Sequence, residues 1–100
     1  MKVLNYNFAG PHTTVENLLN RSGVYLIVDQ QKTNNVLVDV GESSEVKNRI
    51  ENHDRKSCWN QNCVGKLTAY VLYTPGVGQL GRISIEKKIR DGFNPLCGKQ

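Results

Sequence analysis

The chain has 100 residues, a formal net charge of +4 and three cysteines. This length allows a single domain over residues 1–100, with a small core and little left for a second module. The charge favours an anionic partner such as nucleic acid. No apolar stretch has the length of a signal peptide or of a membrane span, so we expect a cytoplasmic protein with no membrane partner. An odd number of cysteines, in a chain with no export signal, predicts reduced thiols and not a disulfide framework.

The N-terminal part predicts one strand and one short helix. Residues 2–8 alternate enough for an edge strand, and Gly10 and Pro11 then interrupt it. Thr13, followed three residues later by Glu16, has the pattern of a capping box. We therefore expect a short helix to begin at Thr13.

Two segments rich in β-branched residues, 23–28 and 35–41, predict a hairpin with a polar turn at 30–34. Placing Tyr25 opposite Asp39 gives the two strands a shared apolar face, which a shift of one residue would destroy. That face is formed by Val24, Leu26, Val28, Val36, Val38 and Val40. We therefore predict this register, with Tyr25 and Asp39 together on the other face.

The residues after Gly41 predict an amphipathic helix that Ser43 or Ser44 caps. Its apolar stripe is formed by Val46 and Ile50. Arg49 and His53 stand four residues apart, so both should project to one side of that stripe, toward the rim of the sheet.

The rest of the chain predicts a third strand and a longer helix. Residues 54–65 are polar, whereas residues 66–74 are apolar on both faces, as in a covered central strand. Residues 80–92 have helical periodicity, and the expected buried stripe is formed by Ile85, Ile89 and Phe93. The expected fold class is therefore α/β (α+β), with a central three-stranded antiparallel β-sheet flanked by helices.

Two glycine-containing tripeptides stand on the two hairpin strands. An arginine follows the second glycine by eight residues, and a histidine comes four residues later. A glutamate on the last helix and an asparagine-proline pair complete the pattern. Its order and spacing resemble the GIY-YIG nuclease family over roughly residues 22–95. The matching positions are Gly23-Val24-Tyr25, Asp39-Val40-Gly41, Arg49, His53, Glu86 and Asn94-Pro95.

The resemblance implies a free-standing, metal-dependent endonuclease that nicks nucleic acid, with DNA as the favoured substrate. Tyr25 would act as general base assisted by His53, and Arg49 would bind the phosphate. Glu86 would bind one Mg²⁺ or Mn²⁺ ion, and Asn94 would hold the site together. Specificity would come from nucleic-acid shape, from a partner protein or from a homodimer.

Several of these residues also have an ordinary structural explanation. Glu86 stands four residues from Arg82 and from Arg90, a spacing that also forms surface ion-pair ladders. Arg49 is by default a solvated or paired arginine, and an isolated His53 is equally a surface histidine.

The chain departs from the family pattern at Asp39, where the family has a second tyrosine. In the predicted register the Asp39 carboxylate would accept the phenol proton of Tyr25 or recruit the metal. The departure equally fits a degenerate domain that binds nucleic acid or a protein partner without cleaving anything.

The cysteine-rich segment offers a zinc site as a further alternative, formed by His53, Cys58, Cys63 and Cys97. A single C-x₄-C pair is below the spacing standard of zinc sites, which disfavours both this site and a zinc-stabilised interaction module. Trp59 is expected to pack in the core, with base stacking as the minority alternative. The basic side chains expected near a phosphate backbone include Lys47, Arg55 and Lys56, although scattered lysines usually form a solvated face.

Overall fold

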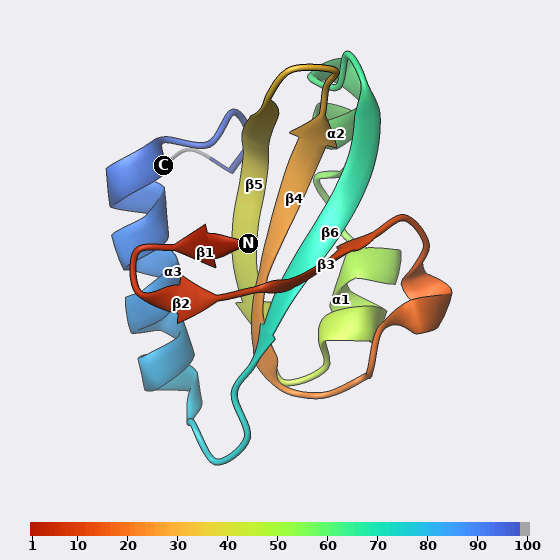
Figure 1. Cartoon of the computed structure of the whole chain (residues 1–100). Helices are drawn as coiled ribbons and strands as arrows, with labels where there is room; N and C mark the ends of the chain where they lie inside the picture. The colour runs from red at the N-terminus through yellow and green to blue at the C-terminus, as the bar shows by residue number, and fades with distance from the viewer. Residues whose placement is uncertain (99–100) are drawn as a thin grey trace.

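The computed structural model describes residues 1–98, which form a four-stranded antiparallel sheet in the order β3-β6-β4-β5 (Figure 1). The strands of this sheet are β3 (Ala9–His12), β4 (Gly23–Gln30), β5 (Asn35–Ser43) and β6 (Lys66–Tyr73). A separate small hairpin consists of β1 (Lys2–Val3) and β2 (Tyr6–Asn7). The helical elements are η1 (Val15–Asn17), α1 (Val46–Glu51), α2 (Lys56–Gln61) and α3 (Gln79–Phe93).

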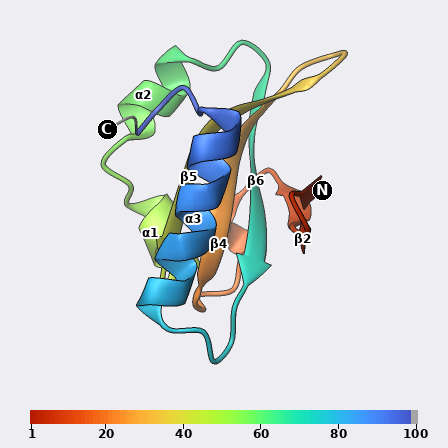
Figure 2. The ribbon, with the colours of Figure 1, turned by 90° about the vertical axis from the view of Figure 1, so that its left-hand side faces the viewer.

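The sheet separates two apolar layers. Figure 2 shows α3 in front of β5, with α1 and α2 on one side of the sheet and the N-terminal hairpin on the other. Ile89 of α3 and Val3 of β1 pack on one face, and Ile50 of α1 and Trp59 of α2 pack on the opposite face. Both faces of the central strands β4 and β6 are therefore covered, which explains their nearly continuous apolar sequences.

The α+β class is confirmed, but the predicted sheet of three strands is wrong. Its fourth strand is β3, which contains Gly10 and Pro11, where a break was expected. A proline is tolerated there because β3 is an edge strand and needs fewer backbone donors. Residues 2–8, predicted as the edge strand, instead form the β1-β2 hairpin outside the main sheet. The capping box at Thr13 is also wrong, since Thr14 precedes η1 and its side chain makes no cap hydrogen bond.

The predicted hairpin is confirmed, but its register is wrong by two residues. Tyr25 pairs with Gly41, and Asp39 pairs with Ile27. The pairing then shifts at a bulge, because Val28 pairs with Leu37 and leaves one extra residue on β5. A shift of two residues keeps each side chain on the same face of the sheet, so the apolar pattern excluded a slip of one residue but not this register.

The helices differ from prediction mainly at their ends. α1 stops at Glu51, so His53 lies beyond the helix that was expected to carry it. α2 falls inside segment 54–65, where no helix was predicted. The predicted helix at 80–92 is confirmed as α3, with Ile89 buried, whereas Phe93 is 49% exposed and does not belong to the core. None of the helices among residues 1–98 has the length and apolar character needed to cross a bilayer.

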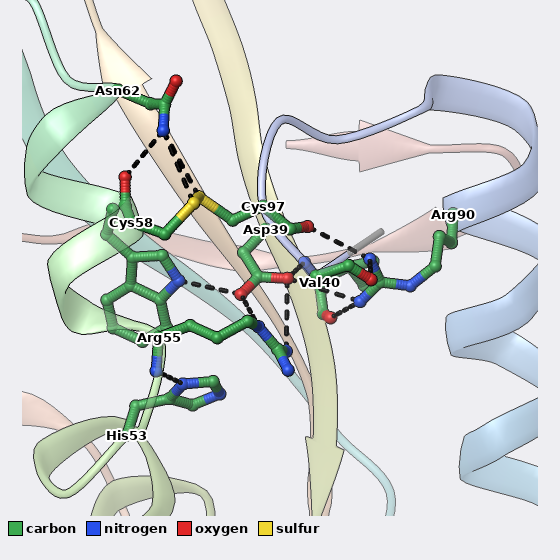
Figure 3. Close-up of a disulfide and its surroundings, with 10 residues drawn as sticks. Asp39, Val40, His53, Arg55, Cys58, Asn62, Arg90 and Cys97 are labelled. Atoms are coloured by element: carbon green, nitrogen blue, oxygen red, sulfur yellow. Dashed lines mark hydrogen bonds and ion pairs between the residues drawn. A yellow bond between two sulfur atoms is a disulfide. The ribbon is translucent and has the colours of Figure 1, made fainter. Parts of the chain in front are cut away.

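After α3 the chain returns to β5 and covers its outer edge. The backbone N–H of Cys97 donates a hydrogen bond to the carbonyl oxygen of Val38, at 2.7 Å. The Cys97 sulfur is bonded to Cys58 of α2 (Figure 3). The prediction that all thiols are reduced is therefore wrong, and Cys63 is the one free cysteine. The two bonded cysteines are 39 residues apart in sequence, so their approach depends on the tertiary fold.

Candidate active site at the edge strand

A buried phenol-imidazole pair lies beside β5, which is one of the two edge strands of the sheet. The phenol oxygen of Tyr25 is 2.8 Å from Nε2 of His53, and both side chains are buried. Nδ1 of His53 accepts the backbone N–H of Arg55 at 3.0 Å (Figure 3). A neutral ring that accepts at Nδ1 carries its proton on Nε2. His53 therefore donates a hydrogen bond to the phenol oxygen and leaves the phenol hydrogen free for another acceptor.

The charge state of this pair follows from burial. Burial, and then the positive charges of Arg49 and Arg55, lower the pKa of His53 to about 4, so the imidazole is neutral at pH 7. Burial also raises the pKa of Tyr25 above its ordinary value, and the charge of Arg49 is the largest opposing influence. A neutral His53 that donates to Tyr25 stabilises a phenolate, but it does not accept the phenol proton through Nε2.

Gly41 is required by the position of the tyrosine. A Cβ atom at Gly41 would overlap the phenol oxygen and the Cζ atom of Tyr25. The pairing of these two residues across β4 and β5 explains this contact, because the ring lies over the glycine of the neighbouring strand. Gly23 meets a similar limit, since a Cβ there would contact the carbonyl oxygen of Leu72 on β6. Both motif glycines are therefore required by the close packing between neighbouring strands of this fold.

Arg49 lies near this pair, and its charge acts on both side chains. Its guanidinium donates to the carboxylate of Asp54 at 2.9 Å, and the two side chains are 39% and 70% exposed. Exposed pairs of this kind contribute little to stability. Arg49 is therefore available to exchange Asp54 for a stronger anionic partner, while its charge already influences Tyr25 and His53.

Asp39 is the centre of a buried hydrogen-bond network that sequence reasoning missed. Its carboxylate accepts from Arg55 Nε, Trp59 Nε1 and the backbone N–H of Val40, each at 2.8 Å. Arg90 of α3 adds a contact at 3.3 Å, and Figure 3 shows Arg55 and Arg90 reaching Asp39 from opposite sides of β5. The prediction that Asp39 faces Tyr25 is therefore wrong. An aspartate in the apolar run of β5 was itself a signal, because a buried carboxylate requires partners.

One of the three predicted basic contacts, Arg55, is held by this network. Arg55 pairs with Asp39 and its side chain is only 30% exposed, so its donors are largely committed. Lys56 is exposed at the start of α2, and Lys47 is partly exposed on α1. Lys47 and Lys56, and not Arg55, present charge to solvent.

Glu86 lies in a groove of about 690 Å³ beside α3 and β5, which we call the Glu86 groove, and its charge acts on Tyr25. Burial raises the pKa of the Glu86 carboxyl, and Arg90, at 3.4 Å, opposes that shift. Arg82 turns away to pair with Glu42 at 3.0 Å, so only half of the expected ion-pair ladder forms. Asn94 borders the groove as the left-handed C-cap of α3, with φ of 50°, a position that favours asparagine after a helix.

The alternative zinc site is not assembled. Cys58 and Cys97 are bonded to each other, which removes two of the four expected ligands. Cys63 instead contacts the carboxylate of Asp29 at 3.4 Å. Among residues 1–98, no group of three or more histidine, cysteine, aspartate or glutamate side chains is arranged to hold a metal ion.

Asp29 is a second buried carboxylate that sequence reasoning missed. It accepts backbone hydrogen bonds from Val64 at 2.9 Å and Gly65 at 2.8 Å. These bonds, with a further one from Gln31, lower the pKa of Asp29 to about 2. Asp29 therefore fastens the loop before β6 to the end of β4 and has a structural role.

The fold and the site together define an α+β protein with an antiparallel sheet and a polar cluster at its edge strand. Comparisons with protein-family models, with curated proteins and with solved structures found no match. The chemistry of the residues themselves must therefore carry the functional argument.

Proposed function

We propose that the chain is a metal-dependent endonuclease of the GIY-YIG type, which hydrolyses phosphodiester bonds and favours DNA. The observation that carries the proposal is the hydrogen bond between Tyr25 and His53, with the exposed cation Arg49 beside it. Gly23 and Gly41 support it, because the close approach of the tyrosine and of the strands requires glycine at both positions. A neutral imidazole, a phenol and a guanidinium at one sheet edge suit a reaction that activates water against a phosphate.

In this proposal the phenolate form of Tyr25 is the base that takes a proton from water, and the phenol proton is first lost to solvent because Nε2 of His53 already carries a proton. The N–H of His53 donates to the phenol oxygen, and the charge of Arg49 lies nearby, so both groups stabilise the phenolate that burial disfavours. Arg49 releases Asp54 and binds the phosphate through its planar pair of donors. His53 has a positioning role in this scheme, since its Nε2 already carries a proton.

Glu86 is the residue proposed to bind the metal. A single carboxylate with water molecules suits Mg²⁺ or Mn²⁺, which retain much of their hydration. The carboxylate fits such an ion, because Glu86 is only partly buried and borders an open groove with Asn94. A bound divalent ion would neutralise phosphate charge and assist the leaving oxygen. Arg90 has to release Glu86 or share it, since the two lie 3.4 Å apart.

The Asp39 network favours a second candidate function, which is nucleic-acid binding without cleavage. The position where the family has its second tyrosine is held here by Arg55, Arg90 and Trp59. The donors to this buried carboxylate are these side chains and the backbone N–H of Val40, and not the phenol of Tyr25. A domain that lost this tyrosine and retained its basic surface would bind nucleic acid with strong salt dependence and no turnover.

The experiment that separates the two candidates is nicking of supercoiled plasmid and of labelled branched, flap and single-stranded DNA with Mg²⁺ or Mn²⁺. The wild type is compared with Arg49→Ala and Glu86→Gln, and with Glu51→Gln, an exposed glutamate on α1, as a matched control. Activity that the first two variants lose and the control retains supports the nuclease. Salt-sensitive binding with no cleavage under either metal overturns it and supports the second candidate.

A further inference from the structure

A second cavity, of about 300 Å³, lies between the sheet and the layer formed by η1, α1 and α2. Its lining includes Ile27 of β4, Ala69 of β6, Ile50 of α1 and Trp59 of α2. We call it the Trp59 cavity. It shares no lining residue with the Glu86 groove, so it is a separate feature of the protein.

One residue that lines the Trp59 cavity has an unsatisfied polar atom. His12 pairs with Ala69 across β3 and β6, and its Nε2 is buried without a hydrogen-bond partner in the described part of the chain. Buried polar atoms in proteins nearly always have a partner. The exposed residues of the lining are polar, namely Thr13, Thr14, Lys56 and Asn60. The cavity therefore combines apolar walls, one buried hydrogen-bonding atom and a cation at its mouth.

The wall of this cavity leads directly to the proposed active site. The ring centroids of Trp59 and His53 are 4.5 Å apart, and His53 is hydrogen-bonded to Tyr25. Trp59 and His53 therefore lie between the cavity and the phenol.

These features indicate which kind of chemical group fits the cavity. Apolar walls exclude an isolated charge, because its desolvation would be uncompensated. The unpaired Nε2 of His12 disfavours a purely aliphatic group, and the indole of Trp59 favours an aromatic ring. A planar heterocycle with hydrogen-bonding edges meets all three conditions, and the volume is at the lower end of the range of ligand pockets.

We propose that the Trp59 cavity receives one unpaired base of the nucleic acid, and that Lys56 contacts the backbone phosphate at its mouth. The identity of the polymer rests on the proposed function. An unpaired base enters such a pocket more easily than one that must first be extracted from a pair. The protein should therefore prefer a bulged or single-stranded nucleotide beside the cleaved bond over a continuous duplex.

The experiment uses the fluorescence of Trp59, which is the only tryptophan in the chain. Two probes are titrated without divalent cation: a duplex with one bulged adenine, and the same duplex with an abasic site in the bulge. The test variant Val15→Phe replaces a small aliphatic side chain of the cavity lining, on η1, with a larger aromatic one. The matched control is Leu19→Phe, which lies on the same segment, is 49% exposed and is outside the cavity.

We expect the bulged adenine to quench Trp59 and the abasic probe to leave it unchanged. Val15→Phe should lose the quenching and bind the adenine probe roughly tenfold more weakly, as expected for one lost base-stacking contact. Leu19→Phe should behave as the wild type does. Equal quenching by both probes overturns the inference, and so does quenching that persists in Val15→Phe.

Cleavage of the same duplexes with Mg²⁺ keeps the two proposals apart. Cleavage that Arg49→Ala abolishes, without base-dependent quenching, overturns the cavity proposal alone. Base-dependent quenching that Val15→Phe abolishes, without cleavage of any probe, supports the cavity and overturns the nuclease.

Discussion

Arg90 on α3 and Asp39 on β5 are joined around the edge of the sheet, with Nη2 and Oδ1 3.3 Å apart. The same guanidinium donates to the carbonyl oxygens of Cys97 and Gly98, at 3.2 and 2.7 Å. One arginine therefore connects the edge strand, the last helix and the C-terminal segment. This connection makes the Asp39 network a determinant of stability.

Asp39→Asn should strongly destabilise the protein. The substitution removes the charge that compensates Arg55 and Arg90, and breaking a buried ion pair typically costs about 3 to 5 kcal/mol. Urea unfolding followed by circular dichroism measures the loss. Asp54→Asn is the control, since the Asp54 side chain is 70% exposed and its ion pair with Arg49 lies at the surface. Similar stability of the two variants would contradict the network described for Asp39.

Reduction of the Cys58–Cys97 bond should also lower stability. Closing a loop between residues 39 apart is expected to contribute about 3 to 4 kcal/mol by restricting the unfolded chain. Cys97→Ser should show the same loss, and added reductant should then have no further effect. Cys63→Ser serves as the control because Cys63 is free. A wild-type protein with the same unfolding midpoint in reducing and oxidising buffer would contradict this prediction.

His53 should make the stability depend on pH in the acidic range. Its pKa is about 4 in the folded protein and 6.5 in the unfolded chain, so the unfolded chain binds more protons between these values. Stability is therefore fully present above pH 6.5 and decreases as the pH falls toward 4. Unfolding curves at intervals across this range measure the slope. His53→Gln should reduce the slope, and an unchanged slope would show that other groups cause it.

Gly41→Ala should disturb the position of Tyr25. The added methyl group would overlap the phenol, and overpacking of this kind typically costs about 1 to 3 kcal/mol. Tyr25→Ala should remove that conflict, so the effect of Gly41→Ala should be much smaller in this background. A double-mutant cycle of unfolding free energies measures the coupling. Additive effects would mean that the two residues are not in contact.

Arg49→Ala should lower the nicking activity and leave the stability of the fold nearly unchanged. Loss of the cation that contacts the phosphate should lower nicking by roughly 10² to 10³-fold, in line with other lost electrostatic contacts to a transition state. The unfolding free energy should change by less than about 1 kcal/mol, because the pair with Asp54 is exposed. Nicking rates and urea unfolding on the same preparation test both statements. Unchanged nicking would remove Arg49 from the proposed mechanism.

Local patterns in the sequence were enough to predict the class of fold and several elements. The β-branched runs predicted the β4-β5 hairpin and β6, and helical periodicity predicted α3. These elements are encoded by neighbouring residues, through side-chain branching and the spacing of apolar positions. The spacing of the motif residues also brought Tyr25 and His53 forward as candidates, and they are in contact.

Only the tertiary structure decided which distant residues meet. Asp39 pairs with Ile27 and not with Tyr25, because a shift of two residues keeps every side chain on its face and the apolar pattern could not exclude it. The partners of Asp39 come from α2, its N-terminal cap and α3, and the bonded cysteines are 39 residues apart. Such contacts depend on how helices pack around the sheet edge, which no local pattern determines. The sequence alone therefore determined the central strands, α3 and the tyrosine-histidine candidates, whereas tertiary packing decided the role of Asp39 and the existence of the Trp59 cavity.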